Sequence, residues 1–474
     1  MPEGNLKIND DAIWPTSIPR PFAASTAVRA VSDRTVTWPL TPRSVAAAIN
    51  LFTAAFSNMP SMDAGYPWQM SAVTSEGIHR AKLARNSIWV CFLLLGSVSM
   101  GWVPRIPEIK DAVGLSNGAF GFVLIGSTFG SIAGAQLAGR FIHTFGSQRV
   151  IFVGAIIMPA GLAGMALSKS AVTLFLTLFT MGIGYALLDM SYNFQGTVVE
   201  KLLGRRYMSS FHAMWSTGAF ITTVVGGAIT RHVSPEVNLL VIAGVCLIAY
   251  LISATFLLPP ELDGHKGDSE HEAKIPLFGK SVMPLWLLGV GLLASLVGEG
   301  AASDWGAILL RDEMGYEKGV YASAFASFAL AMIVSRFLGD RALDHFGPAR
   351  LVKLGGYFGG SIWGIAMAIA IPLSQSYPLP ALVIVNIGFV AAGLGMGPMF
   401  PAFILAATKV PGIAPAVAIS RVGVIGIAGF FFGPTITGAI SQFTNLSIGM
   451  IYPVAMLILS GYLSRGIKSA TAQK

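Results

Sequence analysis

The stretch that decides the fold runs from Leu338 to Arg350 and reads LGDRALDHFGPAR. A related stretch, LAGRFIHTFGSQR, lies 201 residues earlier at Leu137–Arg149. At this offset, identical residues recur within and before the two stretches, and the matched pairs are Asp111/Asp312, Gly114/Gly315, Gly118/Gly319, Ile132/Ile333, Leu137/Leu338, Arg140/Arg341, Phe145/Phe346, Gly146/Gly347 and Arg149/Arg350. Self-similarity at a fixed offset indicates an internal repeat. Each copy is a basic, glycine-containing turn between two apolar segments, which is typical of transporters built from two related halves.

The composition places most of the chain in lipid. The 474 residues are 54% hydrophobic and only 11% charged, whereas a soluble protein is about 25% charged. The net charge of +8 could indicate a nucleic-acid partner, but the basic residues lie mainly in short loops between apolar runs, where they set membrane orientation. Cys91 and Cys246 fall inside apolar runs and are assigned to packing. The sequence predicts no metal and no cofactor, and it has no phosphate-binding loop of an ATP-driven pump.

Apolar runs of about 20 residues, the length that crosses a bilayer, follow one another from Ser87 onward. They predict an all-α membrane protein with twelve transmembrane helices in two pseudo-symmetric bundles of six. The predicted spans are Ser87–Val103, Gly118–Gly139, Val150–Leu167, Val172–Phe194, Ser209–Thr230, Leu239–Leu258, Met283–Asp304, Tyr321–Leu338, Leu351–Ile371, Ala381–Ala407, Ala416–Ile440 and Ile448–Leu463.

The polar segments divide this arrangement into parts. Residues 1–85 lack a spanning run and are interpreted as a disordered cytoplasmic tail, or as an extension of a chain whose translation starts at Met62 or Met70. The N-terminal bundle would cover residues 86–258, the linker 259–282, the C-terminal bundle 283–464 and a second tail 465–474. Lys and Arg are more frequent on the flanks that adjoin the linker, which predicts that both termini and the linker are cytoplasmic. The predicted location is the inner cell membrane.

Six spans on each side of a cytoplasmic loop, with a Gly/Asp/Arg turn between helices 2 and 3, resemble the major facilitator superfamily. The family pattern is roughly GxxxDRxGRR. The first copy keeps Gly139 and Gly146 but has His143 where an Asp is usual, and the second has Asp340 where the first Gly is usual. The run from Glu200 to His212, with GEGA at 298–301 and SDW at 303–305, is similar to a bacterial branch near the fucose permeases. The resemblance implies a monomeric transporter without naming its solute.

The two turns form a candidate conformational motif. An acid near one helix end can cap a neighbouring helix and pair with Arg, and glycine allows the tight reversal. The motif either staples neighbouring helices together or acts as a latch between two states. Its residues are Gly139, Arg140, Gly146, Arg149, Asp340, Arg341, Asp344, Gly347 and Arg350.

Acids inside predicted spans are candidates for proton coupling, because an ionisable residue there costs at least about 2.5 kcal/mol. Glu299 lies deepest in helix 7, and Asp304 is nearer the surface. Asp189 in helix 4 shares a face with Asn193 and Gly196. The fucose-permease resemblance implies an acid in helix 4, for which Asp189 is the nearest match, and another in helix 1, which this chain lacks. Each acid could instead make a structural helix–helix contact.

Other polar residues are candidates for binding the solute or closing the inner side. The candidate solute-binding residues are Asn193, Gln136, Asn386, Trp89 and Ser303. At an offset of 209, Glu200 matches Lys409 and His212 matches Arg421, which predicts a cytoplasmic gate in which Glu200 pairs with Lys409 or Arg421 when the inner side is shut. Ordinary flanking charge is the alternative. Arg336 is expected to pair locally with Asp340 at i+4.

The sequence therefore predicts a secondary transporter, not an enzyme, that moves a small polar solute together with protons. Import of the solute is the preferred interpretation, and proton-driven efflux of a drug or metabolite is the alternative. A non-transporting membrane sensor would be expected to carry a folded soluble domain, and residues 1–85 lack the pattern of one. The expected partners are a small solute, protons and the lipid bilayer, and no nucleic acid.

Overall fold

A computed structural model describes residues 75–205, 207–263, 279, 282–411, 413 and 415–467. The chain separates into two compact units, Met1–Pro60 and Ser61–Lys474, and every described residue belongs to the second. The described residues form helices and turns and contain no strand. The predicted tail as far as residue 74, the alternative starts Met62 and Met70 and most of the predicted linker lie outside the described residues.

The first half of the described chain, here called the N-half, contains eight α-helices and one 3₁₀ turn. Helix α3 packs against α8 and α9, while α6 and α7 both pack on α8. The elements are α3 (Ser75–Met100), η1 (Val103–Arg105), α4 (Ile106–Val113), α5 (Asn117–Val123), α6 (Ile125–Phe145), α7 (Ser147–Ala166), α8 (Ala171–Leu203), α9 (Met208–Ile229) and α10 (Pro235–Ala254).

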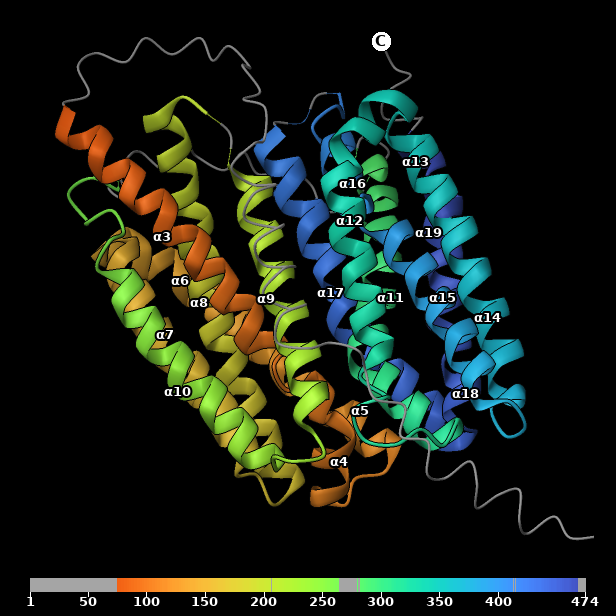
Figure 1. The fold of residues 1–474 in the computed structure, drawn as a ribbon. Helices are drawn as coiled ribbons and strands as arrows, with labels where there is room; N and C mark the ends of the chain where they lie inside the picture. The colour runs from red at the N-terminus through yellow and green to blue at the C-terminus, as the bar shows by residue number, and fades with distance from the viewer. Residues whose placement is uncertain are drawn as a thin grey trace, which may run out of the picture. The chain divides into compact units, whose positions relative to one another are not determined.

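The second half, here called the C-half, repeats this packing with later elements (Figure 1). Helix α11 packs on α17 and α19 as α3 packs on α9 and α10, and α12 and α14 pack on α15 as α6 and α7 pack on α8. The elements are α11 (Met283–Ile308), η2 (Leu309–Glu313), α12 (Ser323–Phe346), α13 (Pro348–Leu354), η3 (Gly355–Gly359), α14 (Gly360–Leu373), α15 (Pro378–Met396), α16 (Met399–Ala407), α17 (Pro415–Phe443), α18 (Leu446–Gly449) and α19 (Ile451–Leu463).

Each of the twelve predicted spans coincides with helix, and ten helices of the described chain are long and apolar enough to cross a membrane. Helix α9 does not meet these criteria, and α12 has a shorter apolar part, Ser323–Gly339. These two helices carry polar residues and pack against each other between the halves. The count of twelve spans stays a prediction. The predicted tail boundary at Arg85 falls inside α3, because the helix continues through its polar first turns to Ser75.

Two of the three matched glycine pairs of the repeat adopt matched backbone conformations, the exception being Gly118, which is helical, and Gly319, which has φ of 88°. Gly114 and Gly315 end corresponding helices with φ of 71° and 73°, and Gly146 and Gly347 join corresponding helices with φ of 84° and 73°. These positive φ angles favour glycine. The repeat seen in the sequence is therefore a repeat of structure.

Candidate functional site

A charged cluster lies where the two halves meet. Glu299 on α11 is buried, with 8% of its surface exposed, and its carboxylate lies 3.8 Å from the guanidinium of Arg336 on α12. Arg336 also donates a 2.6 Å hydrogen bond to the hydroxyl of Ser216 on α9. Ser216 belongs to the N-half and the other two residues to the C-half, so this chain of contacts crosses from one half to the other.

The contact between Arg336 and Glu299 is a partnership that the spacing within α12 did not indicate. The i+4 spacing indicated Asp340, whose side chain lies outside the described set. The described contacts of Arg336 reach α11 and α9, and the local pair with Asp340 stays a prediction. A guanidinium inside a membrane span needs a counter-charge, and the spacing along one helix does not reveal a partner on another.

A second polar group lies on α8 and α9, on the N-half side of the cluster. The side-chain amide of Asn193 donates to the backbone carbonyl of Asp189 at 2.8 Å, and its oxygen lies 3.2 Å from Nε2 of His212. The ring of His212 meets Phe92 edge-on, with centroids 5.0 Å apart. Tyr185, one turn before Asp189, lies within electrostatic range of Asp189, Glu299 and Arg336. The structure therefore brings the predicted Asp189, Asn193, His212 and Glu299 into one region.

A small cavity of about 10 Å³ separates Glu299 from an apolar wall. Such a space holds about one water molecule. Phe325, Phe328, Ala329 and Met332 line it from α12, and Trp215, Ser216 and Ala219 line it from α9. The indole N–H of Trp215 is buried without a hydrogen-bond partner among the described atoms. The cavity thus places an acid, a hydroxyl and an unsatisfied donor between the halves.

The other predicted solute-binding residues make separate contacts. Trp89 donates to Ser210 at 2.8 Å and stacks with Arg85. Asn386 is held within the C-half, where Ser323 and Ser327 bond its amide group.

Ser303 and Asp304 bond each other at 3.1 Å near the far end of α11, away from the Arg336 contact. Gln136 is exposed on α6. Their roles in solute binding and coupling stay predictions.

Four ion pairs join the halves on the face of the protein that contains α4, here called the α4 face. Asp111 pairs with Arg311 at 2.5 Å and Lys110 pairs with Asp312 at 3.8 Å. At the repeat offset, Lys110-Asp111 corresponds to Arg311-Asp312, so each basic residue pairs with the acid of the other copy. The two further pairs are Glu108–Lys318 at 2.9 Å and Arg231–Glu317 at 2.8 Å.

Close helix packing adds to this closure. A Cβ on Gly438 of α17 would lie 2.9 Å from the backbone oxygen of Asn117 and 2.7 Å from the ring of Trp305. The ring of Phe120 on α5 meets Trp305 edge-on at 5.5 Å. That the halves are held together at the α4 face was not predicted from the sequence. The acid that recurs at Asp111 and Asp312 in the two copies was the feature that could have indicated it.

The opposite face, here called the linker face, contains the repeated turns. In the first copy the carboxylate of Asp263, in the linker, accepts from the backbone N–H and the hydroxyl of Ser147, both at 2.7 Å. A carboxylate at the first residue of α7 is favoured by the helix dipole. The linker thus supplies an acid at the start of α7, which sequence reasoning did not find. Pro260 lies 2.7 Å from where a Cβ on Gly146 would be.

The second copy is described less fully, because the side chains of Asp340 and Asp344 lie outside the described set. Arg350 packs over the ring of Phe346 at 5.8 Å. The predicted roles of Arg140, Arg149 and Arg341 in a latch stay predictions.

Glu200 caps the turn that joins α8 to α9. Its carboxylate accepts from the backbone N–H groups of Tyr207 and, at 2.8 Å, Met208. Lys409 is exposed on the same face. The pairing of Glu200 with Lys409 or Arg421 was predicted for the state in which this side is shut, and it stays a prediction.

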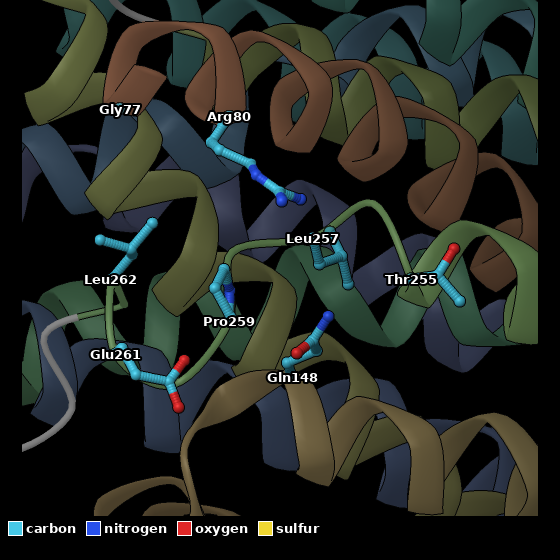
Figure 2. A pocket seen from close by; sticks show the side chains of 8 residues that line it. All are labelled: Gly77, Arg80, Gln148, Thr255, Leu257, Pro259, Glu261 and Leu262. Atoms are coloured by element: carbon cyan, nitrogen blue, oxygen red, sulfur yellow. The ribbon is translucent and has the colours of Figure 1, made fainter. Parts of the chain in front are cut away.

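A larger cavity of about 440 Å³ also opens on the linker face. Figure 2 shows Arg80 reaching from α3 toward the chain around Leu257 and Pro259, with Gln148 and Glu261 nearby. None of the cluster residues lines it. Size alone therefore does not identify the functional site, and the charged cluster between the halves is the stronger candidate.

Apolar helices in two repeated halves, with an acid and a guanidinium between them, define a multi-pass membrane protein of the transporter class. Comparisons with known proteins agree. The model of the Major Facilitator Superfamily matches residues 88–434, and the chain belongs to this family.

Several relatives and structural neighbours are named as transporters. An uncharacterized transporter of Sinorhizobium fredii is 29% identical over 359 residues, which cover 75% of this chain and 91% of the relative. An uncharacterized MFS-type transporter of Yersinia pestis is 28% identical over 375 residues, covering 78% and 92%. A bacterial homologue of the human lysosomal transporter Spinster, solved in an inward-facing, unoccupied conformation, has a TM-score of 0.62 at 15% identity, covering 84% and 99%.

Proposed function

We propose that this protein is a proton-coupled secondary transporter that imports a small polar solute by alternating access. The single observation that carries the proposal is the position of Glu299, buried between the halves and linked through Arg336 to Ser216. The counter-charge of this buried acid, Arg336, is hydrogen-bonded to the other half. Protonation of Glu299 therefore affects the contact between the halves, and movement of the halves affects the protonation of Glu299. Asp189 is the second proton carrier, and Asp304 is a third acid on the same helix as Glu299.

The proposed orientation places the linker face in the cytoplasm and the α4 face outside, in a bacterial inner membrane. The excess of Lys and Arg on the linker flanks supports it. The structure then corresponds to a state that is closed on the outside, as in the inward-facing Spinster homologue. The four ion pairs of the α4 face would break when the solute enters from outside.

The solute is proposed to be sugar-like or another small metabolite. The resemblance of the sequence to the fucose permeases supports this, and the polar groups of Asn193, His212 and Ser216 suit a hydroxyl-bearing solute. The solute would bind between α8 and α9 on one side and α11 and α12 on the other, near the middle of the membrane.

A solute screen in proteoliposomes that contain a trapped pH dye tests the proposal. The native protein should acidify the lumen when one solute class is added outside, and Glu299→Gln or Asp189→Asn should abolish the signal. Glu261→Gln removes an exposed carboxylate far from the cluster and is the matched control. If the solute crosses equally in all variants without proton movement, the proposed coupling is wrong. Addition of the solute to either side of the vesicles distinguishes import from efflux.

A further inference from the structure

We propose that Arg336 is the binding residue for an anionic group of the solute, so that the transported substrate is a small organic carboxylate. The inference rests on the proposed function and narrows its substrate class. It begins from the position of Arg336, whose side chain is 26% exposed in a helix that packs between the halves. A guanidinium is always charged and matches the geometry of a carboxylate.

The described partners of Arg336 do not form a complete arginine–carboxylate contact. A full arginine–carboxylate contact uses two parallel N–H···O bonds of about 2.7–2.9 Å. The contact with Glu299 runs from one nitrogen to one oxygen over 3.8 Å. The only hydrogen bond of the guanidinium to a described side chain goes to Ser216. Because a guanidinium has five N–H groups, these described contacts do not use its full donor capacity.

A further donor lies on α9, next to Ser216 in the chain. Trp215 offers a buried indole N–H without a described partner, and it lines the same small cavity as Glu299 and Ser216. Indole is a donor only, so its partner must be an acceptor. A carboxylate brings two acceptor oxygens, whereas a protonated amine brings none. The donors of α9 and α12 therefore favour an acceptor-rich, negatively charged group.

Charge balance leads to the same ligand. While Glu299 is ionised, it provides the counter-charge of Arg336. When Glu299 takes up the transported proton, Arg336 loses that counter-charge inside the membrane. A carboxylate of the solute then restores it. One proton and one monovalent anion would cross together without net charge, and the proton resides on Glu299 while the anion resides on Arg336.

Matched pairs of small ligands test this assignment on the purified full-length protein. Each pair contains a carboxylate and its neutral amide: lactate and lactamide, glucuronate and glucuronamide, nicotinate and nicotinamide, benzoate and benzamide. Affinity is measured from the shift of the thermal unfolding temperature with ligand concentration. At least one carboxylate should bind about 30-fold or more tightly than its amide. Arg336→Gln should remove this preference, and Lys353→Gln, which changes an exposed charge on α13, should not.

Glu299→Gln provides a second variant that leaves Arg336 in place. It removes the competing carboxylate and should therefore tighten carboxylate binding. Weaker binding in this variant would overturn the inference, as would equal affinity for the amides or no stabilisation by any carboxylate of the set. Carboxylate binding without proton movement would contradict the proposed coupling but retain the anion site. Proton-coupled uptake of a neutral solute alone would retain the function and refute the substrate class.

Discussion

Arg311→Gln should open the α4 face. The Arg311 side chain is 22% exposed and that of Asp111 is 61% exposed, so solvent screens their ion pair, which contributes about 0.5–1 kcal/mol. Arg311 also donates to the backbone carbonyl of Pro107 in the N-half at 2.9 Å, and a hydrogen bond from a charged donor contributes about 1.5 kcal/mol. The substitution therefore removes about 2 kcal/mol from the closed state, which raises the open population about 30-fold where it is minor.

A cysteine at Ala329 reports this opening. Ala329 lines the small central cavity and is 6% exposed, so a membrane-impermeant maleimide added on the side of the α4 face reaches it only when that face opens. The native cysteines, Cys91 and Cys246, are free and buried, and protein without the Ala329→Cys substitution gives their background. The labelling rate should rise about 30-fold in Arg311→Gln.

Arg231→Gln is the matched control. It removes an ion pair with Glu317 and a 3.3 Å hydrogen bond to the backbone carbonyl of Lys318 on the same face. Arg231 is 41% exposed and Glu317 is 80% exposed. Because solvent screens both contacts, together they contribute about 1 kcal/mol or less, so the labelling rate should change about fivefold at most. An unchanged rate in Arg311→Gln, or an equal rise in both variants, would refute the reasoning.

Three further substitutions test other contacts. Gly438→Val should prevent close packing at the α4 face, since even a Cβ would approach Trp305 to 2.7 Å; the Ala329→Cys labelling rate should rise, and a normal rate would contradict the packing argument. Asp263→Asn should destabilise the fold by about 1–2 kcal/mol, because Ser147 loses a charged acceptor at a helix N-terminus; thermal unfolding measures this, with Glu261→Gln as an unaffected control. Glu200→Gln should favour opening of the linker face. Unchanged accessibility of cysteines introduced along that face would contradict the predicted gate.

Much of the fold followed from local patterns. Apolar length located the helices, and the 201-residue offset located glycines that share a positive φ in both halves, such as Gly146 and Gly347. These features depend on short stretches of chain or on identity between copies. The same offset matches Lys110-Asp111 with Arg311-Asp312. Their reciprocal ion pairs could not be predicted from this match, because it does not show that the two copies meet at one face of the protein.

The partners of single charges were harder to predict. The sequence indicated Glu299 and Asp189 as membrane acids, and the structure places them on α11 and α8; their role in coupling stays a prediction. It did not indicate that Arg336 reaches Glu299 and Ser216, because those residues lie on other helices and the local spacing favoured Asp340. The anchoring of Asp263 on Ser147 was missed for the same reason. Tertiary packing determines such contacts, and the spacing of residues along a single helix does not predict them.

The coupling role of Glu299 is tested most directly by comparing two kinds of transport in Glu299→Gln proteoliposomes. One is exchange of labelled for unlabelled solute without a pH gradient, and the other is uphill uptake driven by a pH gradient. A neutral side chain mimics the protonated acid, so exchange should survive while uphill uptake is lost. Uphill uptake at the native rate, or equal loss of both, would contradict the account.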